Sequence, residues 1–565
     1  MTFALNKFLK FLPAATFAMV AEYLMGLADN VICGHIIGEE GLSAINLMQP
    51  MMNLVTFFAL LVGVGSSVLY SIEMGRFEKK RASEFLTQGL WSALMFGALI
   101  MALFAILRVK VAESFGVEGV VLAGVKEYWL WFIPCALLEP VGFFFSSMCY
   151  ADGDDRICAW AYAGQLTGNC VISYFLTLKF GFAGCAIGTA IGHVVTIGIL
   201  LLHFKKRTNS LKFTMHFSLK DTFMICRSAI GDASSRLCQA MLFLSLNLFV
   251  VWRFGEGMLP ILAVAITVLG LSEAFDGVSR AMQPLASVYI GEKNDRLTRR
   301  ILRYAEAASI SEGLLVTLIL LAFPQLATSL VGIDDPGLMA PAHTAVRIVS
   351  LGLCGTALMA LFNSYWTFLS RTVLAFSLTT LSSFVVPAVL FPSLGFALGE
   401  CGVWIALAVS PYMALMIIAF FIVLRWGAKA LPHFLSRARA RRMRVYDLVL
   451  DDETICKTAA KLNKFLAQRR GIGSRKAGLT SLLVEEALMV VKDRNKSKRI
   501  RAEVSIEFTD KIRLTMRDDG EIFDITDTDA EISSLRAYLV SNLMVALPAR
   551  RNMTTTGFNR NAFEI

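Results

Sequence analysis

The sequence predicts an all-α polytopic membrane protein, with twelve transmembrane helices in two six-helix lobes and a small C-terminal cytosolic α/β sandwich domain. Three observations predict this class. The chain of 565 residues is 56% hydrophobic and only 17% charged, whereas about 25% of the residues of a soluble domain are charged. Apolar stretches long enough to cross a hydrocarbon core of about 30 Å recur from Phe11 to Leu424. After Arg444 the apolar runs shorten and charges become dense, which is typical of a soluble domain.

Polar breaks and glycine or proline residues divide the apolar region into spans. We place twelve spans at residues 11–37, 43–73, 85–107, 124–149, 157–178, 182–204, 219–251, 258–290, 304–330, 342–369, 373–392 and 402–425. We expect the first span to be retained as a helix, because no short apolar stretch with a small-residue cleavage site precedes it.

The positive charges predict the orientation of the spans. Lys and Arg gather in connectors of one side, such as GRFEKKRAS, HFKKRTNSLK and GEKNDRLTRR, whereas the opposite loops carry Arg108, Lys110, Lys179 and Arg253. Since cytoplasmic loops are rich in Lys and Arg, we expect a bacterial plasma (inner) membrane location with both termini in the cytoplasm. The net charge of +10 therefore reflects topology, and we expect the lipid bilayer and a small-molecule substrate as partners, but no nucleic acid.

The spans form two halves, an N-lobe at residues 1–210 and a C-lobe at residues 211–430. Each half begins with two long spans followed by a basic connector, and the corresponding glycines Gly75 and Gly291 are 216 residues apart. Such internal similarity is typical of two-lobed transporters.

A basic linker at residues 431–445 leads to the tail domain at residues 446–565. Within the tail, Leu479–Lys492 has the pattern of an amphipathic helix, and two alternating stretches flank a predicted hairpin turn at Thr509–Lys511. We expect this domain to meet a cytosolic regulatory protein.

Polar side chains inside the spans are the candidates for function, because a charge near the bilayer centre costs about 2.5–3.5 kcal/mol on insertion scales. A buried carboxylate can hold a cation when ionised or a proton when burial raises its pKa. The candidates for binding a cation or proton are Asp29, Asn169, Glu22, Asn30 and Ser173. Helical spacing places Glu22 on the face of Asp29 and Ser173 on the face of Asn169.

Three further residues are candidates for a C-lobe cavity, namely Glu273, Asp276 and Gln283. His193 is either a hydrogen-bonded packing residue or a proton carrier. The eleven cysteines have no CxxC or CxxH spacing, so we expect neither disulfides nor a metal site.

Residues 10–430 resemble the multidrug and toxic compound extrusion (MATE) transporters. The resemblance is carried by GLADNVICGHIIGEEGLSAINLMQP, by GVGSSVLYSIEMGRFEKKRA with its counterpart DGVSRAMQPLASVYIGEKNDR, and by CYADGDDRICAWAYAGQLTGNCVISYFL. It implies a V of two lobes that opens alternately to either side, a cation or proton ligand at Asp29, and its neighbour at Asn169. Ser173 stands where many members carry a second aspartate.

The tail resembles a second family, the Bergerat-fold (GHKL) ATP-binding domains of histidine kinases and anti-sigma-factor kinases. LLVEEALMVV resembles the helix with the catalytic glutamate, RDDGEIFD the adenine loop, and TTTGFNRNAFEI the final glycine motif. The resemblance implies nucleotide-binding roles for Glu486, Asp518, Gly520 and Gly557. The resemblance also implies ATP and Mg²⁺ as ligands. Val490 replaces the magnesium-binding asparagine, which predicts a degenerate regulatory domain without catalysis.

The function predicted is ion-coupled (Na⁺ or H⁺) export of small cationic organic compounds by alternating access, without enzymatic activity. Two alternatives stay open. One is a membrane-anchored signalling or partner-switching protein with a kinase-like tail, against which Val490 argues. The other is a flippase of a lipid-linked substrate, against which the acidic residues of the spans argue.

Overall fold

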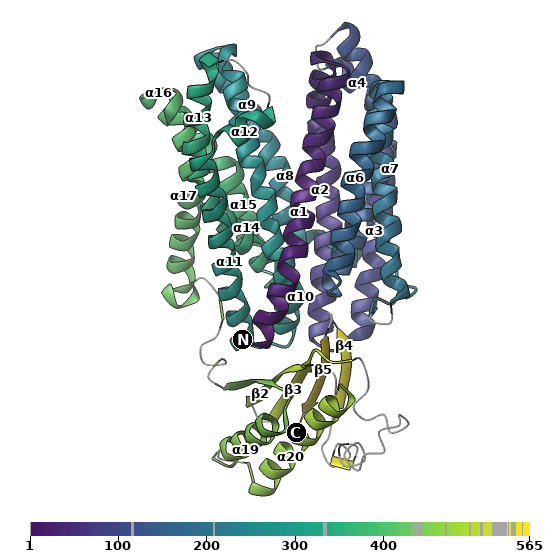
Figure 1. Cartoon of the computed structure of the whole chain (residues 1–565), viewed down its shortest axis with the longest axis vertical. Coiled ribbons are helices and arrows are strands. Elements are labelled where there is room, and N and C mark those ends of the chain that lie inside the picture. The colour runs from purple at the N-terminus through teal and green to yellow at the C-terminus, as the bar shows by residue number, and fades with distance from the viewer. Residues whose placement is uncertain are drawn as a thin grey trace.

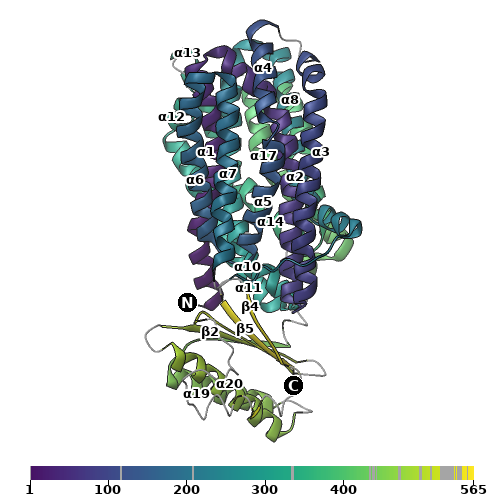
Figure 2. The same ribbon diagram turned by 90° about the vertical axis from the view of Figure 1, so that its right-hand side faces the viewer.

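The computed structural model describes residues 2–114, 118–206, 209–331, 336–431, 434–435, 440, 442–468, 472–495, 499–508, 512–521, 540, 542–543, 550–555 and 558–564. Two bundles of long helices stand side by side, and a sheet covered by two helices lies below them at the end that carries the N-terminus (Figures 1 and 2).

The first bundle contains the helices of the N-lobe. They are α1 (Phe3–Ile36), α2 (Glu39–Gly75), α3 (Lys79–Ser114), α4 (Gly119–Phe132), α5 (Cys135–Ala151), α6 (Asp155–Phe180) and α7 (Phe182–Leu201). Helix α1 begins eight residues before the predicted span at Phe11, because the Thr2 hydroxyl accepts a hydrogen bond from the Leu5 N–H at 3.3 Å and caps the helix.

The second bundle contains the helices of the C-lobe. They are α8 (Leu219–Phe254), α9 (Leu259–Gly270), α10 (Asp276–Gly291), α11 (Asp295–Ala322), α12 (Gln325–Val331), α13 (Pro336–Ser350), α14 (Leu353–Phe368), α15 (Thr372–Thr380), α16 (Val386–Leu398) and α17 (Glu400–Trp426). A 3₁₀ turn at Leu271–Phe275 joins α9 to α10, and a π-helical turn at Leu381–Val385 joins α15 to α16.

The helices are long and apolar enough to place the bundles in a membrane. Within the described residues, nine helical segments are long and apolar enough to cross a membrane. The number rises to eleven if each of the bent pairs α4–α5 (48°) and α13–α14 (40°) is counted as one span. Helix α6 has 26 residues but is not among these spans. The predicted total of twelve therefore stays a prediction.

The two lobes touch at the end of the bundle next to the tail. A Cβ atom on Gly75 of α2 would lie 2.8 Å from the Cα atom of Gly291 of α10. On the same pair of helices, Gln283 donates to the Ser67 hydroxyl at 2.8 Å, again across 216 residues of sequence. Equivalent positions of the two halves therefore contact each other. This is the arrangement expected beside the pseudo-symmetry axis that relates two structural repeats.

The tail is a five-stranded antiparallel sheet in the order β1-β2-β3-β5-β4, with two helices on one face. Its elements are β1 (Met443–Val449), α19 (Asp452–Ala467), α20 (Ser474–Arg494), β2 (Arg501–Phe508), β3 (Ile512–Asp518), β4 (Arg550–Thr555) and β5 (Phe558–Glu564). Strands β2 and β3 pair with Phe508 opposite Ile512, which confirms the predicted hairpin. The predicted helix at Leu479–Lys492 is confirmed within α20.

Alternation along the strands gives the tail sheet two different faces. Val504, Ile506 and Leu514 join the core beneath α19 and α20. Their neighbours Glu503 and Arg517 point to the other face, which lies against the bundle. A side-chain period of two therefore places one hydrophobic and one charged surface on the same sheet.

The charged face of the sheet holds both lobes. The Arg560 guanidinium donates to the Met74 carbonyl of the N-lobe at 2.6 Å and to Glu292 of the C-lobe at 2.9 Å. It also lies 3.8 Å from the centroid of the Phe77 ring. Arg517 forms a second ion pair with Glu292.

Further contacts link the sheet to the C-lobe and to α1. Arg300 of α11 pairs with Asp447 of β1 at 2.6 Å. The Phe3 ring of α1 meets the Phe558 ring edge to face at 5.6 Å. The tail is therefore docked where the lobes meet.

The close contact of Gly75 with Gly291 leads to a prediction. Replacing Gly75 by Ala forces a methyl group into the contact, which we expect to destabilise this arrangement by about 1–3 kcal/mol. The melting temperature of the purified chain should fall. Gly198→Ala is the control, since a Cβ there meets nothing within 4 Å; equal melting temperatures for the two variants would contradict the packing account.

Candidate functional site

A buried carboxylate lies at the centre of the N-lobe group. Asp29 of α1 has 8% of its surface exposed. Its Oδ2 accepts a hydrogen bond from the Thr189 hydroxyl of α7 at 3.1 Å, while Oδ1 has no hydrogen-bonding partner among the described residues. Asn169 of α6 lies beside the same carboxylate. Two helices, α6 and α7, thus bring an amide and a hydroxyl group to one acidic side chain of α1.

Close packing of α6 on α7 fixes the polar residues of this group. The Ser173 hydroxyl donates to the Asn169 Oδ1 at 2.7 Å, and both side chains are buried. Opposite them, a Cβ on Gly188 would lie 2.1 Å from the Ser173 Oγ. A small residue is required at this position, as is common where helices approach closely in membranes.

The structure adds two residues that the sequence analysis missed. Thr189 is the hydrogen-bond donor to Asp29, and the buried Tyr128 of α4 lies near the same carboxylate. The Tyr128 hydroxyl has no hydrogen-bonding partner in the described part of the chain. The position of Thr189 between Gly188 and Gly192 on a helix of small residues was the signal that could have drawn attention to it.

Two other predicted N-lobe residues, Glu22 and His193, have neighbours outside the Asp29 group. Glu22 lies near Arg236, Glu273 and Arg280 of the C-lobe, because two turns of helix separate it from Asp29 along the axis. The side chain of Asn30 lies outside the described residues. The His193 Nδ1 lies 3.3 Å from the Gln165 Nε2, within a network of α6 and α7.

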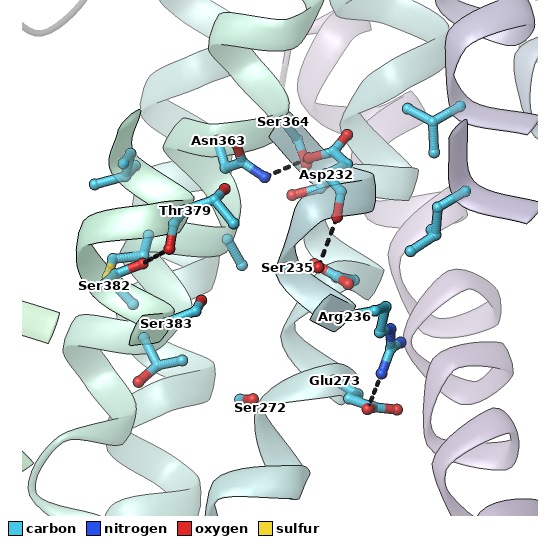
Figure 3. A pocket seen from close by; sticks show the side chains of 18 of the residues that line it. Asp232, Ser235, Arg236, Ser272, Glu273, Asn363, Ser364, Thr379, Ser382 and Ser383 are labelled. Atoms are coloured by element: carbon cyan, nitrogen blue, oxygen red, sulfur yellow. Dashed lines mark hydrogen bonds and ion pairs between the residues drawn. The ribbon is translucent and has the colours of Figure 1, made fainter. Parts of the chain in front are cut away.

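A polar cavity of about 120 Å³ lies in the C-lobe, with part of its wall from α2 (Figure 3). All three predicted C-lobe residues line it, namely Glu273, Asp276 and Gln283. Arg236 points to Glu273 and forms an ion pair with it, and the Asn363 amide donates to the Asp232 carboxylate. The sequence analysis had not selected Asp232, Arg236, Arg280 or Asn363 for this cavity.

The cavity carries more acidic than basic groups. Its lining includes three carboxylates and two guanidiniums, from Asp232, Glu273, Asp276, Arg236 and Arg280. With the ionisable groups charged, the lining has a net charge of −1. A cavity of this composition favours a ligand with positive charge over an anion of the same shape.

In the tail, the predicted adenine contact is already occupied by the chain itself. The Asp518 Oδ1 accepts hydrogen bonds from the Asn559 amide at 2.8 Å and from the Gly520 N–H at 3.1 Å. Burial raises the pKa of Asp518 to about 6 despite the hydrogen bond from Asn559. A Cβ on Gly520 would lie 2.8 Å from the Asn495 Nδ2, so this amide fills the space beside the glycine.

The remaining residues of the predicted nucleotide-binding set are Glu486 and Gly557. Glu486 lies on α20, and Val490 is buried in the hydrophobic core of the tail. Gly557 lies outside the described residues. Among the described His, Cys, Asp and Glu side chains, no group could hold a metal ion.

Three comparisons with known proteins agree with one another. Residues 14–175 match the family model MatE. The probable multidrug resistance protein NorM of Thermotoga maritima is 21% identical over 440 residues, which cover 75% of this chain and 93% of the relative.

The solved structures extend this similarity to the fold. An outward-facing multidrug resistance MATE family transporter of the MOP superfamily matches with a TM-score of 0.70 at 19% identity, covering 75% of this chain and 96% of the other. A MOP superfamily transporter from Pyrococcus furiosus, whose binding pocket is described as having reverse polarity, also matches with a TM-score of 0.70 at 20% identity. The match covers 76% of this chain and 96% of the other. Together the family model and the relative show that the chain is similar to MATE proteins, and the solved structures show that it shares their fold.

Proposed function

We propose that this chain is a secondary-active exporter that couples the movement of Na⁺ or H⁺ to the export of small cationic organic compounds. The two lobes alternate between openings to either side of the membrane. The chain lies in a bacterial plasma membrane with its termini in the cytoplasm, where the basic connectors also lie. The observation that carries the proposal is the buried Asp29 carboxylate, with Oδ1 unpartnered among the described residues and Thr189 and Asn169 beside it.

The surroundings of Asp29 suit an ion that binds and leaves. A permanent arginine or lysine partner would fix the charge of the carboxylate, but the groups that contact it are a hydroxyl and an amide. Oxygen atoms of this kind can complete the shell of a hard cation, and the open Oδ1 can equally take a proton. Burial of an unneutralised carboxylate is costly in the membrane, so occupation by an ion would change the relative energies of the two conformations.

Cargo would bind in the C-lobe cavity. A positive group would meet Asp276, which has no hydrogen-bond or ion-pair partner among the described residues, whereas Glu273 is already paired with Arg236. Because the cavity borders α2 of the N-lobe, movement of the lobes would change its exposure. This position supports alternating access as the transport mechanism.

We further infer that the tail regulates opening on its own side of the membrane. The sheet binds the N-lobe through the Met74 carbonyl and the Phe77 ring, and the C-lobe through Glu292. These contacts are compatible with one another only while the lobes stay together at that end. The tail, a degenerate relative of Bergerat-type domains, would thus hold the cytosolic side closed, and release of the sheet would permit opening.

Asp29→Asn should abolish ion-driven export. The amide keeps the size of the side chain, but it has no negative charge to bind a cation and does not exchange a proton as a carboxyl group does. We therefore expect at least about a tenfold loss of gradient-driven transport. The assay is movement of a fluorescent organic cation in proteoliposomes under an imposed Na⁺ or proton gradient. Glu127→Gln, at an exposed carboxylate, is the control. Unchanged coupling in Asp29→Asn would refute this role.

Arg560→Ala should loosen the tail from the lobes. Hydrogen bonds to charged groups contribute about 1.5–3 kcal/mol each, and this change removes those to Met74 and Glu292. We expect faster amide hydrogen exchange at residues 74–79 and 291–294. Arg499→Ala, which removes an exposed arginine of the tail, should leave exchange there unchanged; the same effect from both variants would mean that docking does not depend on Arg560.

Docking of the tail should weaken as the pH rises. Burial raises the pKa of Glu503 from 4.5 to about 7, although Arg517 and Arg300 lower it, and Asp447 and Glu292 raise it further. The docked state therefore binds the proton more tightly, and this stabilisation is lost as the pH increases from about 4.5 to 7. The melting temperature of the docked tail should be higher at pH 5.5 than at pH 8.

Glu503→Gln provides the control for this pH effect. The amide cannot ionise, so the difference between the two pH values should shrink. A difference of the same size in the variant would show that another group causes the pH dependence.

A further inference from the structure

A second hollow lies between the C-lobe and the tail and is lined almost entirely by arginine. Its volume is about 630 Å³, and its walls consist of Arg296, Arg299, Arg300, Arg303, Tyr304, Ala440 and Arg444. Four of these arginines lie in the first three turns of α11, whose lower end stands beside the tail (Figure 1). The fifth belongs to β1.

Acidic side chains of the described residues balance only part of this positive charge, with Glu306 near Arg303 and two carboxylates near Arg300. Arg300 pairs with Asp447 at 2.6 Å and lies 3.9 Å from Glu503. Arg296 and Arg299 donate instead to the carbonyls of Met443 and Leu435, at 2.9 and 3.3 Å. Because these carbonyl acceptors are neutral, they do not offset the positive charges of Arg296 and Arg299.

The remaining donors are available to a ligand. The Arg299 Nε is buried and has no acceptor among the described residues. Arg303 is exposed and lies near the Glu306 carboxylate, and Arg444 stacks on the Phe465 ring at 5.0 Å. Arg444 and Arg300 are also close enough to Arg296 for their charges to repel it. Bringing five like charges around one hollow is unfavourable unless an anion occupies it.

The chemistry of arginine identifies the kind of anion. A guanidinium offers a planar fork of N–H donors that matches two oxygens of a phosphate group, and several guanidiniums can bind one phosphate-bearing ligand. The N-terminus of α11 adds the positive end of its helix dipole. The positive-inside rule accounts for arginines on this side of the membrane, but it does not require that they converge on one hollow.

We propose that this arginine-lined hollow binds a phosphate-bearing polyanion, either the headgroup of an anionic phospholipid or a soluble polyphosphate. The ligand contacts α11 of the C-lobe and Arg444 of the tail at once. Its binding neutralises the repulsion between the two parts and holds the tail on the C-lobe. This site is separate from the Asp29 group and from the C-lobe cavity, so it does not depend on ion-coupled transport.

The test measures binding to the purified full chain in nanodiscs of neutral phosphatidylcholine. One arm titrates inorganic pyrophosphate by calorimetry, and the other replaces part of the lipid by phosphatidylglycerol and follows the melting temperature of the tail. Arg303→Gln is the main variant, because the Arg303 side chain is exposed and lines the hollow. We expect it to weaken pyrophosphate binding about tenfold, or to remove most of the stabilisation by phosphatidylglycerol.

Two further variants make the outcome decisive. Arg299→Gln/Arg303→Gln should remove the remaining response. Arg475→Gln/Arg499→Gln removes the same charge at exposed positions of the tail and should bind like the wild type. A response to pyrophosphate alone identifies a soluble ligand, and a response to phosphatidylglycerol alone identifies a lipid. The proposal is overturned if neither ligand has an effect, or if the control double variant loses as much binding as Arg299→Gln/Arg303→Gln.

Discussion

The cost of burying charge away from water is the constraint on which this structure depends. Several charged groups deep in the molecule lie against a partner of opposite charge. Arg236 pairs with Glu273 within the C-lobe, and Glu503 pairs with Arg517 within the tail. Asp29 departs from this pattern, since only neutral groups contact it and one of its oxygens has no partner among the described residues. Because the charge of this buried carboxylate is incompletely compensated by the protein, we propose that a mobile ion binds to Asp29.

The same constraint connects the membrane bundle with the tail. Arg517 and Arg560 are fully buried, and Glu292 lies between them. Among the described residues, Arg560 and Glu292 pair with each other only when the sheet rests on the bundle, whereas Arg517 would keep its ion pair with Glu503 if the two parts separated. Paired burial of this kind gives modest net stability but demands one particular arrangement. It therefore suits a contact that must distinguish one conformation of the lobes from another.

Sequence patterns predicted the helical bundle and the tail hairpin, because each depends on local periodicity, and they singled out Asp29 as a carboxylate inside a span. Helical spacing also placed Ser173 beside Asn169 correctly. It failed for Glu22, because a shared helix face does not determine which neighbouring helix that face meets. Thr189 and Arg236 were missed for the same reason, since their partners lie 160 and 37 residues away in sequence. Docking of the tail on both lobes depends on long-range contacts that no local pattern encodes.

The most direct measurement of the central claim is difference infrared spectroscopy of the purified full chain, titrated separately with Na⁺ and with acid. The account predicts that one carboxyl group responds to at least one of these ions in the wild type, and that its band disappears in Asp29→Asn. The response should survive in Glu127→Gln. An identical carboxyl response in the wild type and in Asp29→Asn would contradict the assignment of the coupling ion to Asp29.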